Sequence, residues 1–258
     1  AGTSNVRFGV NAGNSITSGG NYNVLIGDEA GTAITTGDNN VAIGFEALKT
    51  EDGNGNNVAI GFRSLKTLNA GAEAYTTAVG YNAGGSITTG VRNTIMGAFA
   101  GDALTDADYN VAIGYAALTG DTKGSNSVAI GYETLLAQNF TTSTDSHNTA
   151  VGYRAGTAVT TGIYNTLVGG LAGDAITNAD YNVAIGGNAL GQNTVGSRIV
   201  AVGYGALTSH NPATATDTYN TAVGMLAGEN VTTGTLNTLV GGLAGDALTT
   251  GFNNVAVG

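Results

Sequence analysis

The stretch Asn110-Val111-Ala112-Ile113-Gly114 decides how this chain folds. Its residues alternate, so that Val111 and Ile113 face one side of an extended segment while Asn110 and Ala112 face the other. β-Branched residues on one face are typical of a short strand. The glycine at the end tolerates a positive φ and lets the chain turn. The stretch therefore predicts a short strand closed by a glycine turn.

This phrase, or a variant of the general form Asn, apolar or Thr, small, apolar, Gly, recurs fifteen times along the 258 residues. Most closing glycines are separated by the same interval, since 61 − 44 = 17 and 114 − 97 = 17. A strict short period over a whole chain predicts stacked supersecondary units rather than a globular fold around a central pocket. The closing glycines are Gly9, Gly27, Gly44, Gly61, Gly80, Gly97, Gly114, Gly131, Gly152, Gly169, Gly186, Gly203, Gly224, Gly241 and Gly258.

A longer period is superimposed on the first. From Gly80 the intervals are 17, 17, 17 and 21, and the same order follows from Gly152, so that 152 − 80 = 72 and 224 − 152 = 72. The fourth residue after the closing glycine is Gly in two successive repeats, as at Gly84, and Leu in the next two, as at Leu118. In the glycine repeats an apolar residue such as Ile87 follows at the seventh position. We expect these repeats to fill one interior space in two ways, within a 72-residue super-repeat of four rungs.

These periods predict an all-β fold, a parallel β-solenoid or β-roll of about 15 rungs with a 17-residue rung. Each strand should pair with the equivalent strand one rung away, at about 4.8 Å. No shift in composition marks a linker, so residues 1–258 are expected to form a single repetitive domain. The chain starts within a rung and stops inside the motif, which favours a segment of a longer fibre or array.

Composition excludes several classes of protein. Glycine supplies 43 of the 258 residues but there is one proline, so a collagen helix is excluded. The absence of cysteine excludes disulfide bonds. No run of about 18 apolar residues is present, so no membrane insertion is expected. A net charge of −10, from 18 acidic and 8 basic residues, disfavours nucleic-acid binding.

The small residues in the middle of the phrase suggest an interface. By the alternation they form one flat apolar column, which we expect on the outer side of the strand. Small side chains allow backbones to approach closely, and an exposed apolar strip promotes association. The column is therefore expected to be an intersubunit contact, around a threefold axis, with a monomeric solenoid as the alternative. Its members are Ala42, Ala59, Ala112, Ala129, Ala150, Ala184, Ala201 and Ala222.

The phrases NNVAIG (residues 39–44), NSVAIG (126–131) and NTAVGY (148–153) resemble the head repeats of trimeric autotransporter adhesins. They resemble still more the repeat regions of phage tail-fibre proteins. The resemblance covers essentially the whole chain. It implies a left-handed parallel β-roll, a homotrimer, and an adhesive or shaft role on a virion or cell surface. Adhesin rungs are usually shorter than the rung of this chain, so the cross-section is expected to differ.

Catalysis finds little support in the residues. The only histidines, His147 and His210, lie far apart in the sequence, in the longer fourth-rung loops. A hydrolytic site needs a nucleophile, a base and an orienting group that converge. We expect no enzyme and no cofactor, with both histidines as solvated loop residues. Asp102, Asp174 and Asp246 recur at 72-residue spacing as turn formers or, alternatively, cation ligands; we expect no metal site.

The loops of the fourth rungs are the better candidates for recognition. Residues 138–147 and 208–218 carry the four-residue insertion and should project from one side, where solenoids often bind partners. The alternative is a tolerated surface loop. Aromatic residues often follow the closing glycine and should stack, with either a structural or a sugar-gripping role. The candidate recognition residues are Asn139, Phe140, Asp145, His147, His210, Pro212 and Asp217.

The sequence therefore predicts a structural and adhesive fibre, a non-catalytic, extracellular β-solenoid shaft that associates with copies of itself. The alternative is a self-assembling extracellular filament subunit that acts as a scaffold. Binding of a cell-surface glycan through the side loops is compatible with either. The two hypotheses differ in the mass expected in solution, which is a discrete trimer for the first and an indefinite filament for the second.

Overall fold

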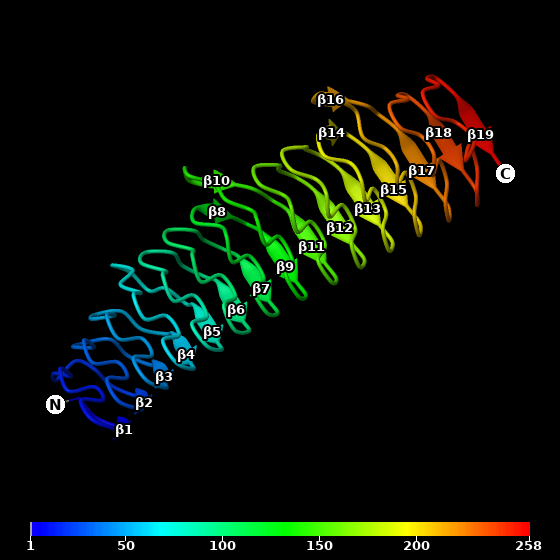
Figure 1. The fold of residues 1–258 in the computed structure, drawn as a ribbon. Coiled ribbons are helices and arrows are strands. Elements are labelled where there is room, and N and C mark those ends of the chain that lie inside the picture. The colour runs from blue at the N-terminus through cyan, green and yellow to red at the C-terminus, as the bar shows by residue number, and fades with distance from the viewer. Residues whose placement is uncertain (1) are drawn as a thin grey trace. The chain divides into compact units, whose positions relative to one another are not determined.

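The computed structural model describes residues 2–258, and within them every regular element is a β-strand. Contacts divide the chain into two compact units, residues 2–127 with 140–144 and residues 128–139 with 145–258. In each unit the chain forms successive flat coils, and each coil contributes one strand to the same sheet (Figure 1). The predicted parallel β-solenoid of about 15 rungs, with a typical 17-residue rung, is confirmed.

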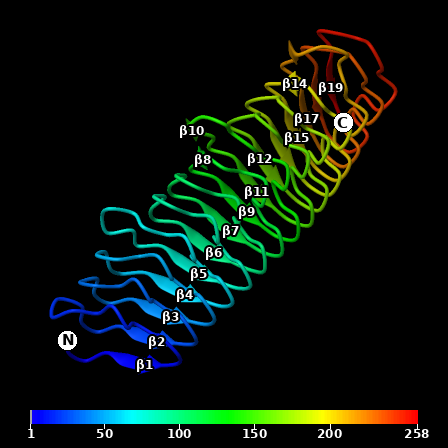
Figure 2. The ribbon, with the colours of Figure 1, turned by 60° about the vertical axis from the view of Figure 1, so that its left-hand side comes forward.

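The sheet of the first unit consists of seven three-residue strands. Each pairs in parallel with the next, so that Val41 lies opposite Val58 and Ala42 opposite Ala59. The same coil is seen from another side in Figure 2. The strands are β1 (Val6–Phe8), β2 (Val24–Ile26), β3 (Val41–Ile43), β4 (Val58–Ile60), β5 (Thr77–Val79), β6 (Thr94–Met96) and β7 (Val111–Ile113), followed by the two-residue β8 (Gly124–Ser125).

The sheet of the second unit has eight strands in the same parallel register. Ala184 lies opposite Ala201, which lies opposite Ala222. A two-stranded ladder joins β14 (Gly196–Ser197) to β16 (Thr216–Asp217), which lies in one inserted loop of the following rung, and β10 (Thr144–Asp145) lies in the other inserted loop. The strands are β9 (Val128–Ile130), β11 (Thr149–Val151), β12 (Thr166–Val168), β13 (Val183–Ile185), β15 (Val200–Val202), β17 (Thr221–Val223), β18 (Thr238–Val240) and β19 (Val255–Val257).

The closing glycines are required by the backbone. Gly152 has a φ of 139°, a conformation that residues with a side chain rarely adopt. A Cβ at Gly152 would lie 2.5 Å from the carbonyl oxygen of Gly169 in the next rung. The glycine therefore allows both the turn and the close stacking of rungs, which explains its strict recurrence.

The alanines of the strands lie inside the solenoid, and the expectation that they form an outer strip is wrong. In β3, Ala42 is fully buried while Val41 and Ile43 are half-exposed. The predicted alternation is correct, but the buried and the exposed sides of the strand are the reverse of those expected. The narrow interior already holds a leucine from the opposing turn, so only a small strand residue fits there. Each of the residues Ala42, Ala59, Ala112, Ala129, Ala150, Ala184, Ala201 and Ala222 has 0% exposure.

The interior is filled by complementary volumes. In the glycine rungs, Ile87 occupies the space that a side chain at Gly84 would take, since a Cβ there would lie 3.0 Å from the Cδ1 of Ile87. Between two glycine rungs the strand residue is large. Ile95 lies 3.2 Å and 3.1 Å from the Cβ positions of Gly84 and Gly101. In the leucine rungs the leucine itself fills the interior, and Leu118 is fully buried. The expectation of two ways of filling one space is confirmed.

A column of buried asparagines precedes the strands. Asn40 donates its backbone N–H to the Oδ1 of Asn23, at 2.9 Å, and Asn23 donates its Nδ2 to the carbonyl oxygen of Gly37, at 2.9 Å. The side chains therefore act as both acceptors and donors for neighbouring rungs. This arrangement satisfies buried backbone groups at the corner where the strand begins.

Candidate functional site

Each unit presents one flat apolar sheet face to solvent. The first and third residues of most strands point outward and are half-exposed, as Val111 and Ile113 are in β7. Some are more open, with Ile185 at 38% and Val223 at 38% exposure. Because the strands are in register, these side chains form two continuous rows. An extended exposed apolar surface of this kind is typical of a site that contacts another molecule.

Aromatic rings that follow the closing glycines border this face on one side. Phe45 and Phe62 stack with ring centroids 5.4 Å apart, and Phe62 and Tyr81 at 5.0 Å. In the second unit Tyr132 and Tyr153 stack at 5.5 Å. The expected aromatic stack is confirmed. Because the rings cover one another's faces, a sugar has access only to ring edges along these runs.

A second ring column, which the sequence analysis missed, lies five residues before the closing glycines. His147 stacks on Tyr164 with centroids 4.9 Å apart, and Tyr164 on Tyr181 at 5.1 Å. The guanidinium of Arg198 lies 4.8 Å from the Tyr181 ring and 5.9 Å from the Tyr219 ring. These residues adopt a φ of 49–60°. The recurring Tyr-Asn dipeptide at 17-residue spacing could have revealed this column.

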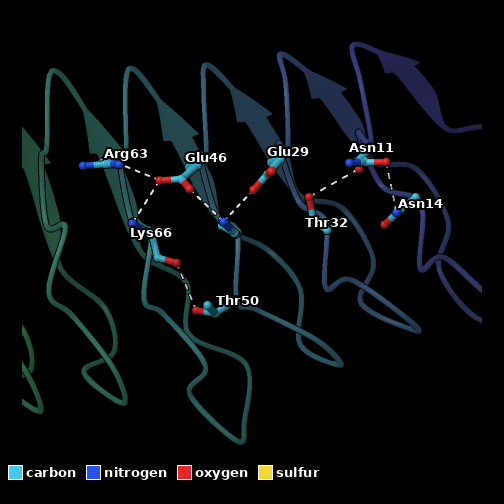
Figure 3. A network of polar contacts seen from close by, with 9 residues as sticks. Asn11, Asn14, Glu29, Thr32, Glu46, Thr50, Arg63 and Lys66 are labelled. Carbon is cyan, nitrogen blue, oxygen red and sulfur yellow. Dashed lines mark hydrogen bonds and ion pairs between the residues drawn. The ribbon is translucent and has the colours of Figure 1, made fainter.

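A charged cluster occupies the outer surface of the first unit (Figure 3). Glu46 lies 2.7 Å from Lys49, 2.8 Å from Arg63 and 2.9 Å from Lys66. Glu29 also contacts Lys49, at 2.5 Å. Hydrogen bonds from Lys49 and then Lys66 lower the pKa of Glu46 to about 2, and the bonds to Glu29 and Glu46 raise the pKa of Lys49. Each of the cations is paired with a carboxylate, so the cluster mainly joins rungs.

The inserted loops expose some of the candidate recognition residues. Asn139, Asp145, His147 and Asp217 are exposed. Asp217 is held by an ion pair with Arg198, at 2.9 Å. These side chains are the part of the candidate set that a partner can reach.

Three other candidates are buried, so the expectation that they are recognition residues is wrong. Phe140 has 7% exposure, His210 has 0%, and Pro212 is also buried. The rings of Phe140 and Pro212 pack on the backbone at Gly124 and Gly196, where an added Cβ would lie 2.8 Å and 3.1 Å from them. The inserted loops fold back onto the preceding rung, so these residues serve packing and are out of reach of a partner.

His210 is buried without hydrogen-bond partners for either ring nitrogen. Desolvation lowers the pKa of His210 to about 4, so the ring is neutral near pH 7. Burial likewise raises the pKa of Glu51, which accepts hydrogen bonds from Asp52, Asn54 and Ala70. The expectation that His210 is a solvated loop residue is therefore wrong. Both groups are components of the core.

No metal centre or enclosed pocket is found within residues 2–258. No three His, Asp or Glu side chains in this range are placed to hold a metal ion. Burial raises the pKa of Asp174, whose charge interacts with Arg154. Asp102 accepts a hydrogen bond from Thr119. The candidate site is thus an extended surface.

Over residues 2–258 no helix is long and apolar enough to cross a membrane.

Comparison of the chain with protein-family models, with curated proteins and with solved structures gives no match.

Proposed function

We propose that the chain is part of a structural and adhesive fibre, a non-catalytic shaft displayed outside the cell on a virion or cell surface. The observation that carries the proposal is the flat apolar face with its aromatic borders. In the second unit eight three-residue strands span about 34 Å along the stack and about 10 Å across it. The product, roughly 340 Å², is comparable to the largest exposed apolar patches of monomers, about 300–600 Å², which are often functional.

The proposed partner of this face is the same face on two further copies. Outward Val, Ile and Thr side chains lie in straight rows and can pack around a threefold axis. The proposed interface is therefore formed by the outward strand residues and not by the buried alanines. The resemblance of the motif to trimeric adhesin and tail-fibre repeats supports three copies. In such a shaft the proposed 72-residue super-repeat would give a longitudinal period of four rungs, about 19 Å.

The alternative proposal is a self-assembling filament subunit, a scaffold with glycan binding through the side loops. It draws support from the exposure of Asp145 and Asp217 on the inserted loops. In that case copies would add end to end, and the sheet face would serve lateral contact between filaments.

Light scattering on the 25.4 kDa chain, with electron microscopy of the same sample, tests the proposal. A species with three times the mass of the single chain, seen as short rods, is expected. Ile113→Lys together with Ile185→Lys should reduce the mass to that of one chain, since both side chains lie on the face. Thr142→Lys, in an exposed loop, is the matched control and should leave the trimer intact. A wild-type monomer would contradict the proposal, and long filaments would favour the alternative.

A further inference from the structure

In the second unit the aromatic column beside the sheet face lacks rings at several positions, two of which lie between Tyr153 and Tyr204. Tyr153 and Tyr204 both follow closing glycines, but the two rungs between them carry Gly170 and Gly187 at that position. Three rung spacings separate the two tyrosines, about 14 Å. Two consecutive positions of the stack therefore carry no ring of their own. Tyr153 and Tyr204 are also more exposed, at 55% and 60%, than Tyr132 within the stack, at 44%.

Tyr153 turns an uncovered side toward the gap, and the ring of Tyr204 leans into it. One face of Tyr153 is covered by Tyr132, at 5.5 Å with planes 12° apart, so the other face points toward the rung of Gly170. A Cβ at Gly170 would meet no atom within 4 Å. The ring of Tyr204 leans toward Gly187, with its Cδ2 3.3 Å from the Cβ position there. The gap therefore leaves one face of Tyr153 open to solvent, while the Tyr204 ring covers Gly187 at the other end.

The two glycines are not required by the fold. Neither Gly170 nor Gly187 has a positive φ, and neither has backbone atoms crowding its Cβ position. The first unit shows that a missing ring can be replaced, because Phe99 fills the column next to Ala98, 5.2 Å from Tyr81 and 6.1 Å from Tyr115. The residues after the two glycines, Leu171 and Asn188, carry no ring. The vacancy is thus a local feature of the sequence and not a demand of the backbone.

Polar groups adjoin both ends of the gap. Arg154 follows Tyr153, and its side chain is 43% exposed beside Glu133, with 3.4 Å between Nε and Oε2. Asn188 follows Gly187, is exposed, and donates its Nδ2 to the hydroxyl of Thr208, at 2.7 Å. A ligand in the gap would therefore meet aromatic faces together with a guanidinium and an amide at the rim.

We propose that the gap between Tyr153 and Tyr204 binds a terminal pyranose of a glycan. The C–H groups on one face of a pyranose suit the negative face of a tyrosine ring, and its hydroxyls suit the guanidinium and amide at the rim. The sugar ring enters as an extra layer of the stack. This inference goes beyond the proposed shaft role.

Saturation-transfer NMR and calorimetry on the full chain test this site. The probes are the methyl β-glycosides of glucose, galactose and N-acetylglucosamine and the methyl α-glycoside of N-acetylneuraminic acid. At least one should bind, and Tyr153→Ala and Tyr204→Ala should each weaken its binding tenfold or more. Gly170→Tyr restores the ring found at this position in other rungs, as Tyr115 and Tyr132 show. It should abolish binding without lowering the melting temperature. Tyr181→Ala, in the other ring column, is the control and should bind normally.

Three results would overturn the proposal. One is a lack of binding by all four probes. Another is binding that survives Gly170→Tyr in a folded chain. The third is a change in oligomer mass caused by Gly170→Tyr, with sugar binding unaltered, which would show that the gap receives a second copy of the chain. Failure of the proposed trimer would appear separately, as a monomer mass that still binds the sugar.

Discussion

The backbone N–H of Asn110 donates a hydrogen bond of 2.9 Å to the side-chain Oδ1 of Asn93, one rung earlier. Asn110 in turn donates its Nδ2 to the carbonyl oxygen of Gly124, at 2.9 Å, and accepts from the backbone N–H of Ser127, at 2.8 Å. Asn110 therefore joins three successive rungs, through its backbone N–H to the earlier rung and through its side chain to the following one. Asn110 is fully buried, so water does not replace these bonds.

Asn110→Ala should lower the free energy of unfolding by about 2–4 kcal/mol, because it leaves a buried N–H and a buried carbonyl without partners. Urea denaturation followed by circular dichroism measures the change. Asn178→Ala is the matched control, since Asn178 is exposed and makes one weak contact with Thr177. It should change stability by less than about 0.5 kcal/mol. Equal effects of the two variants would contradict the role of the column.

Gly152→Ala should destabilise the second unit by more than about 3 kcal/mol, since a Cβ is both strained at a φ of 139° and 2.5 Å from the next rung. The paired variant Gly170→Ala places the same methyl group in open space and should leave the thermal midpoint unchanged. Thermal melting of the two proteins compares them directly. Similar midpoints would show that the closing glycines are dispensable.

Stability should fall as the pH is lowered through the range governed by His210. The unfolded histidine titrates near pH 6.5, whereas the pKa of His210 in the folded chain is about 4. Between these values the unfolded chain binds a proton that the folded chain does not, so stability declines as the pH falls and levels off below pH 4. The expected contribution is about 2–3 kcal/mol.

His210→Gln isolates this effect, because Gln138 occupies the equivalent buried position in another leucine rung. The variant should lose less stability than the wild type between pH 7 and pH 4. His147→Gln, which changes an exposed histidine, should retain the wild-type loss. Urea titrations at several pH values provide the comparison. Parallel curves for the wild type and His210→Gln would refute the assignment.

Glu46→Gln should cost about 1–2 kcal/mol at pH 7, a discounted figure because its three cationic partners are 31–42% exposed. The pKa of Glu46 is about 2 in the folded chain, below the unfolded value of 4.5. Its stabilisation is therefore complete above pH 4.5 and is lost as the pH falls toward 2. Glu229→Gln is the control, since Glu229 forms no ion pair within residues 2–258. Urea denaturation at low and high salt measures the change in stability. A loss that disappears at high salt would show that the ion pairs of Glu46 are screened by solvent.

The repeat made the coil predictable in detail. The spacing of the closing glycines predicted the strands, their parallel register and the rung length. This is because the closing glycine, with its positive φ, stands at the same place in every coil. The alternation of Gly84 and Leu118 likewise predicted the two ways of filling the interior. These features depend on local sequence and on identical neighbours, so one chain suffices to infer them.

Alternation alone does not predict which face of each strand is buried. A period of two shows that Val111 and Ala112 face opposite ways, but the interior volume decides which of them is buried. That volume depends on buried side chains outside the strand, such as Leu118, which the sequence of the strand does not reveal. The same limit applies to His210, because an inserted loop can project or fold back with equal local propensity.

The ladders also determine how each unit responds to mechanical force. The hydrogen bonds between rungs, such as that from Val41 N to Asn57 O at 2.8 Å, run along the direction in which the rungs stack. Tension in that direction opens the bonds of one rung before those of the next, as in a zipper. Each rung that detaches releases a length of chain on the order of 50–55 Å. A unit pulled in this way should therefore yield in many small steps and absorb energy gradually.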